Sequence, residues 1–564
     1  MAVSQDRDKA GSGATDPYAA MHHGFRWPRP ERFNIAQVCC RRWALGGKGA
    51  SGGPENIAVI DHSTLGSGTF HSYSELQEAA NRLSNLLVAQ GVCRGDRVAI
   101  VLPQRFETAV AYMAVLQMGA VAMPLSILFG PEALEFRLQD SEAVLAIGDE
   151  ASIGAVQGVR ARCPQLRTVV GLGAATDADL DAAASMRGAS PDFDLVETQA
   201  DDPAVLIYTS GTTGNPKGAL YSHRSNILHA YAAVMPDAMA LSSRDAVMPV
   251  VPMFHVNAWG TPFSMAMTGC KVVFPGPQLD GKSLYELIEA EQVTFSAGVP
   301  TIWQMLLMHV QSKGLRFSSL NRTVIGGSAC PPAMIDAFAD LGVRVIHAWG
   351  MTELSPLGAL STLKLKNESL PADEKRRLLA KQGRPIFGVD LKIIDENGED
   401  LPHDGTTYGN LMARGNWVIE RYFRFDKSAV IDGGWFHTGD VATIDPDAFM
   451  QITDRSKDVI KSGGEWISSI DVENIAMGHP AVAMAACIGM PHPKWDERPI
   501  AVVALKPDAQ LTREELLAFY EGKLAKWQIP DDVVFVDAIP LGATGKMLKT
   551  KVRQMLGDYK LPDL

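Results

Sequence analysis

The stretch "AVLIYTSGTTGNPKGAL", residues 204–220, joins a short apolar run to a loop rich in hydroxyls and glycine. Its first five residues predict a buried strand. The loop then offers side-chain hydroxyls and bare glycine N–H groups, which are the donors that a polyphosphate needs, and a lysine that can neutralise it. The sequence therefore predicts a phosphate-binding loop made of Thr209, Ser210, Gly211, Thr212, Thr213, Gly214 and Lys217.

A second stretch, "GPQLDGKS" at residues 276–283, matches the G-x-x-x-x-G-K-S pattern of a P-loop nucleotidase between an apolar run and a helical pattern. Two of its residues oppose that role. Pro277 has no N–H to donate, and Asp280 would set a carboxylate beside the phosphates. We predict a proline–glycine turn here, with Ser283 starting a helix. A P-loop ATPase built on Lys282 is the alternative interpretation.

Composition limits the classes of protein that fit. A chain of 564 residues predicts more than one domain, and 46% hydrophobic with 21% charged residues is typical of a globular protein. The net charge of -12 argues against a general nucleic-acid-binding or anionic-membrane surface. Seven scattered cysteines without C-x-x-C spacing predict neither disulfides nor a zinc site, and favour a reducing cytoplasmic location.

Residues 109–129 carry no charge and are numerous enough to span a bilayer. Gln117 and Gly119 interrupt the run, however, and Pro124 would break a continuous helix. We therefore predict a buried helix over 107–118, a turn at Gly119 and a buried strand over 120–125, with no transmembrane segment.

The rest of the chain alternates apolar runs, such as 97–103, 144–149 and 344–349, with helical patterns. This alternation predicts an α/β fold with ligand loops at the carboxyl ends of strands. Residues 1–30 predict a loose N-terminal tail. The sequence becomes polar and glycine-bearing near 454, which predicts a large domain over 31–454 and a small domain over 455–564.

Six motifs occur in order along the chain: "YTSGTTGNPKG" (208–218), "GGSACP" (326–331), "AWGMTE" (348–353), "GWFHTGD" (434–440), "DRSKDVIKSGGEWIS" (454–468) and "LGATGKMLK" (541–549). Together they resemble the adenylate-forming superfamily, which includes acyl-CoA synthetases, aryl-CoA ligases, peptide-synthetase adenylation domains and beetle luciferases. The resemblance covers the chain from about residue 30. It implies a large α/β adenylation domain of sheets flanked by helices, and a small mobile C-terminal α+β domain.

The resemblance also implies a reaction in two steps. A carboxylate attacks the ATP α-phosphate and expels pyrophosphate, and the acyl-adenylate is then cleaved by a thiol. In the first step Thr209 and Glu353 are implied to hold Mg²⁺, a hard cation that prefers oxygen ligands, and Lys546 to bridge the carboxylate and the α-phosphate. Outside these motifs, we would interpret Glu353 as a surface carboxylate and Lys546 as a solvated lysine.

The nucleotide pocket is also assigned by resemblance. Trp349 is implied to stack on the adenine, where family members usually have Tyr or Phe, and Asp440 and Arg455 to take the ribose hydroxyls. Taken alone, either of the last two would be half of a solvated ion pair. The full implied set for ATP and AMP, beyond the phosphate loop, is Gly327, Ser328, Ala329, His347, Ala348, Trp349, Gly350, Met351, Thr352, Asp440, Ile452 and Arg455.

For the second step, Lys457 is implied to be the hinge about which the small domain rotates. Lys461 is implied to assist catalysis, and Ser462, Gly463 and Gly464 to line the coenzyme A channel, where glycine lets the thiol approach the backbone. A plain turn is the alternative for this glycine pair.

The segment "PMFHVNAWG", residues 252–260, is the most informative about the acid. It resembles medium- and long-chain fatty acyl-CoA synthetases, in which a tryptophan at the position of Trp259 gates the acyl tunnel, and it places His255 near the reacting carboxylate. The implied pocket is His255, Val256, Trp259, Gly298, Val299 and Pro300. In contrast, residues 25–37 and 124–134 look more like medium-chain and aryl-acid ligases, so aliphatic and aromatic acids both stay open.

The function expected from these observations is an ATP-dependent acid–CoA ligase, with Mg²⁺ and coenzyme A required. An aryl or other small-acid ligase is the runner-up, and a free-standing adenylation protein that loads a carrier protein is a further alternative. A luciferase-like oxygenase shares the first half-reaction. A non-catalytic binding protein is disfavoured because Lys546 and Glu353 are both present. The sequence leaves a homodimer open.

Overall fold

The computed structural model describes residues 31–45, 56–63, 68–173, 175, 177–209, 215–455, 458–462, 465–542, 546–557, 559 and 561. Several sequence predictions lie outside the described residues. They concern the N-terminal tail 1–30, five residues of the phosphate loop, the hinge and the coenzyme A glycines: Ser210, Gly211, Thr212, Thr213, Gly214, Lys457, Gly463 and Gly464.

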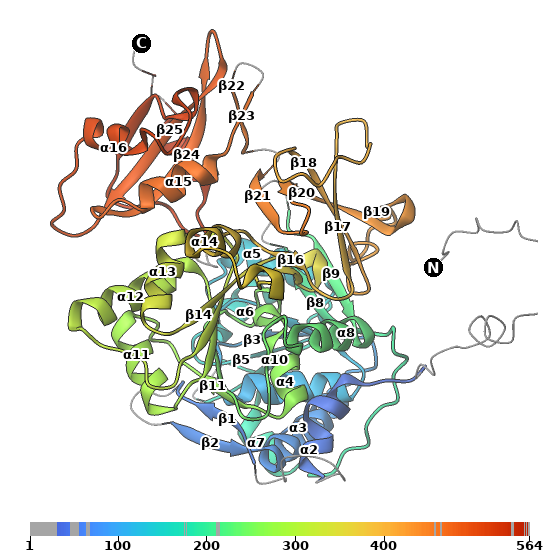
Figure 1. Cartoon of the computed structure of the whole chain (residues 1–564). Helices are drawn as coiled ribbons and strands as arrows, with labels where there is room; N and C mark the ends of the chain where they lie inside the picture. The colour runs from blue at the N-terminus through green and yellow to red at the C-terminus, as the bar shows by residue number, and fades with distance from the viewer. Residues whose placement is uncertain are drawn as a thin grey trace, which may run out of the picture.

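The structure is a mixed α/β fold in which the described residues form four sheets (Figure 1). The largest sheet has the order β16-β15-β14-β13-β12-β10-β11-β1-β2. Its central strands are parallel, whereas β2, β15 and β16 are antiparallel to their neighbours. The strands are β1 (Ile57–Asp61), β2 (Thr69–Ser72), β10 (Ala246–Pro249), β11 (Lys271–Phe274), β12 (Phe295–Gly298), β13 (Arg322–Ile325), β14 (Arg344–Gly350), β15 (Leu357–Leu360) and β16 (Arg384–Pro385).

The second sheet has the order β7-β6-β5-β3-β4-β8-β9 and is parallel except for its edge strand β9. Strands β3, β4, β5, β6 and β8 are short and mostly buried, as expected for strands covered on both faces, whereas the edge strand β7 has no buried residue. The strands are β3 (Arg97–Val101), β4 (Val121–Pro124), β5 (Leu145–Gly148), β6 (Thr168–Gly171), β7 (Leu180–Asp181), β8 (Pro203–Tyr208) and β9 (Gly218–Ser222).

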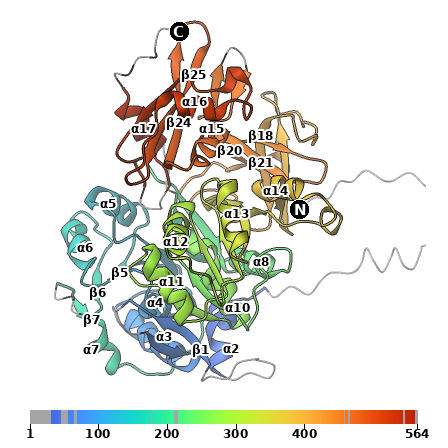
Figure 2. The ribbon, with the colours of Figure 1, turned by 60° about the vertical axis from the view of Figure 1, so that its left-hand side comes forward.

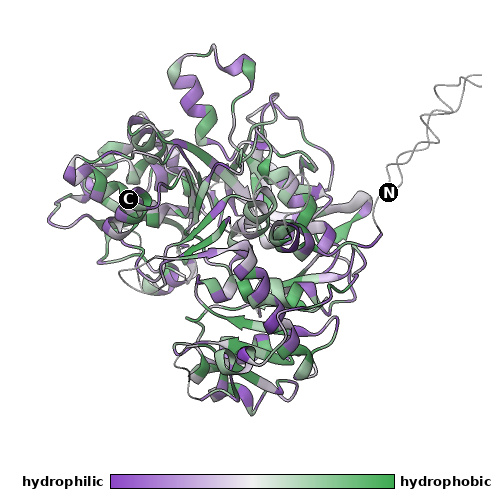
Figure 3. Cartoon of the chain, turned by 90° about the horizontal axis from the view of Figure 1, so that it is seen from below, coloured by the Kyte–Doolittle hydropathy of each residue, from purple (hydrophilic) through white to green (hydrophobic). Residues whose placement is uncertain are grey.

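Apolar clusters show how these two sheets are layered. One cluster lies between the sheets and contains the buried faces of α3 (Tyr73–Ala89), α4 (Phe106–Gln117), α8 (His223–Val234) and α10 (Thr261–Thr268). The outer face of the first sheet is covered by α11 (Gly281–Ala290), α12 (Pro300–Lys313) and α13 (Pro332–Asp340), and that of the second by α5 (Pro131–Asp140) and α6 (Ile153–Arg160). Figure 3 shows green, apolar residues on the central strands and alternating green and purple on the surrounding helices.

Two smaller sheets follow along the chain. The third comprises β17 (Val389–Ile394), β18 (Gly409–Gly415), β19 (Val430–Ile431), β20 (Trp435–Ile444) and β21 (Met450–Arg455). The fourth comprises β22 (Ile460–Ser462), β23 (Glu465–Ile467), β24 (Val482–His492), β25 (Asp496–Leu505) and β26 (Asp532–Phe535). It packs with α15 (Ser469–Met477), α16 (Arg513–Tyr520) and α17 (Lys549–Met555), and lies apart from the two larger sheets in Figures 1 and 2.

Shorter helical segments complete the chain. They include a π-helix at Gln37–Arg41, α2 (Arg42–Ala44), α7 (Ala182–Arg187), α14 (Ala372–Ala380) and 3₁₀ turns at Thr352–Leu354, Leu365–Asn367, Asp432–Gly434 and Lys526–Gln528. The third sheet ends at Arg455 in β21, one residue past the predicted boundary at 454/455, and the fourth sheet follows it. The boundary itself stays a prediction.

The uncharged run 109–129 forms α4, a turn at Gly119 with φ of 75°, and β4, as predicted from its interrupting residues. In the part of the chain that the structure describes, no helix is long and apolar enough to cross a membrane.

The predicted start of one helix, at Ser283, is wrong by two residues. Helix α11 begins at Gly281, two residues before Ser283, because the Asp280 side chain caps it. The Asp280 carboxylate accepts hydrogen bonds from the backbone N–H groups of Lys282 and Ser283, both at 3.0 Å. The donors that a P-loop would turn toward phosphate are therefore already satisfied.

Candidate functional site

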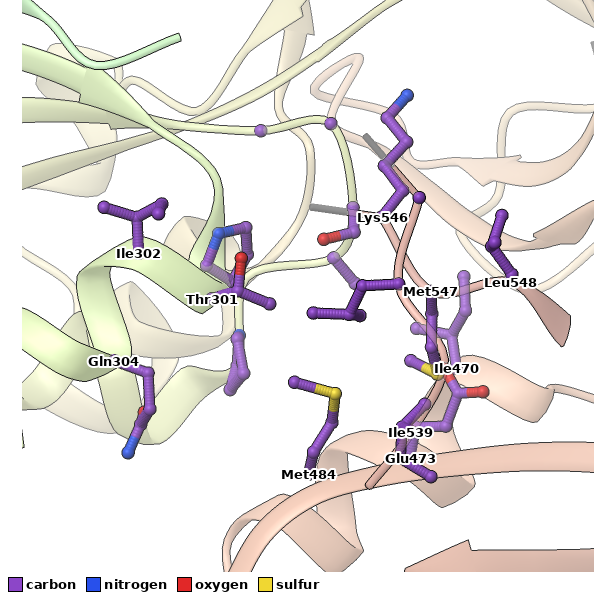
Figure 4. A pocket seen from close by; sticks show the side chains of 18 of the residues that line it. Thr301, Ile302, Gln304, Ile470, Glu473, Met484, Ile539, Lys546, Met547 and Leu548 are labelled. Atoms are coloured by element: carbon purple, nitrogen blue, oxygen red, sulfur yellow. The ribbon is translucent and has the colours of Figure 1, made fainter. Parts of the chain in front are cut away.

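A cleft of about 1390 Å³ lies where the large sheets, the third sheet and the C-terminal segment meet. Its lining comes from strand ends, from α12 and α13, and from the segment that contains Lys546 (Figure 4). Both the predicted phosphate loop and the predicted adenine motifs contribute to it. The cleft therefore collects residues that are more than three hundred positions apart in the sequence.

The phosphate loop joins two antiparallel strands, β8 and β9, in which Tyr208 pairs with Gly218. The ends of the loop are tied together. The N–H of Thr209 donates to the Lys217 carbonyl at 2.8 Å, and the N–H of Lys217 donates to Oγ1 of Thr209 at 3.0 Å. Thr209, Asn215 and Lys217 all line the cleft. A hairpin tip thus carries the loop, whereas a P-loop leads from a strand into a helix.

Lys546 projects from the C-terminal segment into the cleft (Figure 4). A β-bridge between Leu541 and Met547 holds its segment, and the N–H of Gly542 donates to the Lys546 carbonyl at 2.7 Å. Burial lowers the pKa of the Lys546 ammonium to about 8; Arg455 lowers it further, and Asp440 and Glu353 oppose the shift. The charges that act on this ammonium therefore belong to residues assigned to nucleotide and magnesium binding, namely Arg455, Asp440 and Glu353.

Glu353 is a buried carboxylate, 7% exposed, that lines the cleft. The Tyr422 hydroxyl donates to its Oε1 at 2.7 Å, and Nζ of Lys217 lies 4.8 Å from the centre of the Tyr422 ring. No cationic side chain of the described residues forms an ion pair with Glu353. A buried carboxylate that lines a cleft, and that has no ion-pair partner among the described residues, fits a divalent cation that also takes phosphate oxygens.

Trp349 and Arg455 both bind the carboxylate of Asp440, which is buried. The indole N–H of Trp349 donates to Oδ2 at 2.9 Å, and Nε of Arg455 lies 2.9 Å from Oδ1. Burial raises the pKa of Asp440, while Arg455 and Trp349 counteract the shift. Gly358 makes room for the indole, since a Cβ there would lie 2.4 Å from its Cζ3 atom. Tryptophan therefore supplies a donor that neither phenylalanine nor tyrosine offers from the same ring position.

Three residues predicted for the nucleotide and acid pockets do not line the cleft: His347, Gly298 and Val299. His347 lies behind the adenine motif, where its Nε2 accepts from the N–H of Cys330 at 3.2 Å and its Nδ1 lies 2.9 Å from the carbonyl of Ala380. Burial lowers the pKa of His347 to about 4, so the ring is neutral. Both ring nitrogens are thus engaged by the backbone, and His347 supports the adenine loop from behind. Gly298 packs against Trp303 and Val299 against Gly327.

The remaining predicted lining is brought together around Gly327. A Cβ placed on Gly327 would lie 3.4 Å from Cε of Lys546 and 3.7 Å from Cζ2 of Trp259. The predicted catalytic lysine and a predicted residue of the acid pocket therefore lie beside the same glycine. The other predicted residues that line the cleft are His255, Val256, Pro300, Ser328, Ala329, Ala348, Gly350, Met351, Thr352 and Ile452.

The segment before Trp259 has an unusual backbone. Residues 256–259, assigned to α9 (Val256–Trp259), have φ between 45° and 62°, which is the left-handed region. Asn257 is held there by the Tyr112 hydroxyl, which donates to its Oδ1 at 3.0 Å. Burial, followed by the charge of Lys546, lowers the pKa of His255 to about 3. His255 is thus a neutral imidazole beside a cationic lysine.

The residues assigned to the second step lie elsewhere. Lys461 and Ser462 belong to β22 and do not line the cleft. Lys461 is exposed, and Oγ of Ser462 accepts from Nη1 of Arg498 at 3.0 Å. The structure therefore brings together described residues that are assigned to the first step, among them Lys546, Glu353 and Trp349, and keeps Lys461 and Ser462 apart from them.

The AMP-binding enzyme family model matches residues 48–423, and the model of the AMP-binding enzyme C-terminal domain matches residues 471–546. The chain belongs to the AMP-binding enzyme family. It is an acid–thiol ligase of the AMP-forming type, as the names of related proteins also indicate.

Two members of this family illustrate the similarity in sequence. A 3-methylmercaptopropionyl-CoA ligase of Ruegeria pomeroyi is 47% identical over 508 residues, which cover 88% of this chain and 94% of that protein. A medium-chain-fatty-acid–CoA ligase of Ectopseudomonas oleovorans is 44% identical over 514 residues, covering 89% and 94%. Among solved structures, ATP-bound MatB from Rhodopseudomonas palustris is 26% identical, with a TM-score of 0.79 over 94% of this chain and 100% of that one.

Sequence analysis missed several polar residues of the cleft in this AMP-binding enzyme. Tyr422 lies in none of the six motifs, Asp454 is the first residue of the fifth motif but was given no role, and Arg137 lies in α5 outside any motif. Glu473 forms an ion pair with Lys549, at 2.7 Å, and Lys549 stands three residues after Lys546 in the last motif. The position of Lys549, three residues after Lys546, is the only sequence feature that could have pointed to a second buried lysine on this segment, and therefore to a carboxylate such as Glu473 as its partner.

Proposed function

We propose that this enzyme activates an unbranched aliphatic acid of medium to long chain length as its acyl-adenylate and then transfers the acyl group to coenzyme A. The observation that carries the proposal is the meeting of Lys546 and Trp259 at Gly327, within 3.4 and 3.7 Å of a Cβ placed there. The lining of the same cleft includes the apolar residues Leu125, Phe129, Met239, Phe254 and Val256, which we call the acid recess, and this supports an apolar acid whose carboxylate meets the cation.

In the first step, Lys546 neutralises the carboxylate and the α-phosphate as they approach each other. A preorganised cation in a water-poor cleft stabilises charge that develops between two anions. Glu353 would hold Mg²⁺ together with Thr209, and the ion would supply charge neutralisation of the phosphate oxygens. The neutral His255 lines the same region without adding a competing charge.

Nucleotide binding rests on the Trp349–Asp440–Arg455 group. Trp349 presents its ring face for the adenine, while its N–H fixes the carboxylate that would accept from the ribose. Arg455 already balances the charge of Asp440, so ribose hydroxyls enter a group that is neutral as a whole. The Lys217 ammonium and the hydroxyl of Thr209 would bind the β- and γ-phosphates.

The second step would use a different arrangement of the C-terminal domain. In the present one Lys546 occupies the cleft, and Lys461 and Ser462 lie outside it. Rotation about Lys457 would withdraw Lys546 and bring the β22–β23 turn, with Gly463 and Gly464, to the acyl-adenylate. Coenzyme A would then enter beside that turn.

A short thioether acid is a second candidate substrate. The 47% identical relative from Ruegeria pomeroyi is named for 3-methylmercaptopropionate. A thioether is apolar and has nearly the length of a short alkyl chain, so it suits the same recess. Each additional buried methylene contributes roughly 0.8 kcal/mol to binding. A recess deep enough for a long chain would therefore favour octanoate over 3-methylmercaptopropionate, and a shallow recess would not.

The test is acid-dependent release of pyrophosphate with straight-chain acids from acetate to palmitate, 3-methylmercaptopropionate and benzoate. We expect kcat/KM to rise with chain length to at least octanoate. A maximum at 3-methylmercaptopropionate would select the second candidate. Saturation by benzoate without response to aliphatic acids would refute both, and release of ADP without any acid would instead favour an ATPase.

A further inference from the structure

Arg137, in α5, is a buried cation that none of the assignments above uses. Its side chain is 6% exposed and lines the cleft. The guanidinium carbon lies 4.1 Å from the centre of the Phe129 ring and 5.7 Å from that of Tyr208. In Figure 2, α5 lies at the edge of the large sheets that is turned toward the C-terminal domain.

The hydrogen bonds of Arg137 are incomplete. Nη1 donates to the carbonyl of Ala133 at 2.7 Å, within the same helix. Nε is buried and has no acceptor among the described residues, and no carboxylate in that part of the chain forms an ion pair with the guanidinium. The nearby Asp140 instead accepts from the Tyr208 hydroxyl at 2.7 Å. Burial lowers the pKa of Arg137 to about 10, which leaves it cationic at neutral pH.

A buried cation without a counter-charge is unfavourable. Stacking on two aromatic rings compensates part of that cost, but it provides no acceptor for the N–H groups that do not bond to Ala133. A guanidinium presents a planar fork of donors that matches phosphate oxygens. An anionic ligand in the cleft would therefore supply the missing counter-charge and accept hydrogen bonds from the accessible end of the guanidinium.

The neighbours of Arg137 show where such an anion would lie. Tyr208 directly precedes Thr209, the first residue of the phosphate loop, and Asn215 and Lys217 line the same cleft. On the other side, Phe129 packs against Phe254, with ring centres 5.7 Å apart, next to His255. Arg137 thus lies between the phosphate loop and the wall of the acid site.

We propose that Arg137 is an additional phosphate-binding residue of the cleft, which pairs with the diphosphate group of a bound nucleotide. The proposal rests on the function proposed above, because the cleft must then admit two diphosphates. One belongs to ATP and leaves as pyrophosphate, and the other belongs to coenzyme A. Both offer the same chemistry to a guanidinium.

The experiment compares Arg137→Met with Arg42→Met in the full-length enzyme. Arg42 is a matched control, since its guanidinium carbon lies 4.4 Å from the Trp43 ring centre, its Nε is also buried without an acceptor, and it does not line the cleft. Calorimetric binding of inorganic pyrophosphate, coenzyme A and pantetheine is measured without turnover. Acid-dependent turnover by the wild type then tests the proposed function separately.

We expect Arg137→Met to weaken the binding of pyrophosphate at least tenfold, or to weaken the binding of coenzyme A at least tenfold while pantetheine binding is unchanged. Arg42→Met should change the binding of neither pyrophosphate nor coenzyme A by more than twofold. Weaker binding of pyrophosphate would identify the diphosphate of ATP as the group that Arg137 binds, and weaker binding of coenzyme A would identify the diphosphate of coenzyme A. The proposal is overturned if Arg137→Met binds all three ligands like the wild type, if pantetheine weakens as much as coenzyme A, or if both variants weaken equally. Arg137→Lys, which keeps the cation but loses the fork, replaces the methionine variant if that one does not fold, with an expected loss of three- to tenfold.

Discussion

At the scale of single residues, the role proposed for Lys546 predicts that the first step depends on pH. Its pKa of about 8 makes the free enzyme cationic at this position below that pH and neutral above it. We therefore expect kcat/KM for ATP, measured by pyrophosphate release, to fall about tenfold per pH unit above this value. Lys546→Arg keeps its charge over the whole range, so its profile should stay flat while its rate is lower. A wild-type profile that is flat to about pH 9.5 would show that the pKa of Lys546 is not lowered in the free enzyme, because an ordinary lysine stays charged up to about pH 10.4.

The indole N–H of Trp349 gives a second prediction at this scale. Trp349→Phe keeps a ring for the adenine but removes the hydrogen bond to Oδ2 of Asp440. A hydrogen bond to a charged group contributes about 1.5–3 kcal/mol, so we expect KM for ATP to rise roughly tenfold or more. Steady-state kinetics with ATP and 2′-deoxy-ATP provide the check. Equal KM values for the variant and the wild type would mean that Arg455 alone orients Asp440.

At the scale of elements, the start of α11 shows why the P-loop pattern carries no phosphate site. Asp280 caps the helix, and Lys282 is exposed, with its Nζ 3.7 Å from Oε1 of Glu286. Lys282→Ala should leave pyrophosphate release within about threefold of the wild type, because an exposed ion pair contributes about 0–1 kcal/mol to stability. Loss of two or more orders of magnitude, in a protein that folds normally, would reassign the phosphate site.

A buried ion pair joins α15 to α17. Nζ of Lys549 lies 2.7 Å from Oε1 of Glu473, and it also donates to Oγ of Ser469. Glu473 raises the pKa of Lys549 against the effect of burial. Lys549→Met leaves Glu473 buried and unpaired, so we expect unfolding in urea to show a loss of about 3–5 kcal/mol. The double variant with Glu473→Met should recover most of that loss. A double variant as unstable as the single one would contradict this account.

The same elements show how far sequence reasoning reaches. The interruptions at Gln117, Gly119 and Pro124 identified α4 and β4 because a turn residue and a proline act locally. The convergence of Lys546 and Trp259 on Gly327 could be expected only from ordered motifs, since nothing local joins positions so far apart. The indole bond to Asp440 and the unpaired Arg137 depend on which side chains the fold places opposite each other. Residue types alone do not specify that arrangement.

At the scale of the whole molecule, the structure matches the arrangement that we propose for the first step and not the one that we propose for the second. Lys546 lies in the cleft, whereas Lys461 and Ser462 lie outside it. Contacts across the predicted boundary accompany this arrangement. Oγ of Ser468 donates to the Thr453 carbonyl at 2.7 Å, and the N–H of Ser469 donates to Oδ2 of Asp454 at 2.8 Å. If the C-terminal domain rotates between steps, these contacts must break, and each step can be disabled separately.

Two variants test that separation. Lys546→Ala should reduce adenylate formation about 100-fold or more, by analogy with the loss of a preorganised donor, yet still convert a supplied acyl-adenylate and coenzyme A to thioester. Gly464→Leu should do the reverse, because a leucine side chain would fill the space that the thiol needs. Pyrophosphate and thioester are followed separately for each variant, with Arg42→Met as a folded control remote from the cleft. If both variants impair the two steps to the same degree, a single arrangement performs both and the rotation proposed here does not occur.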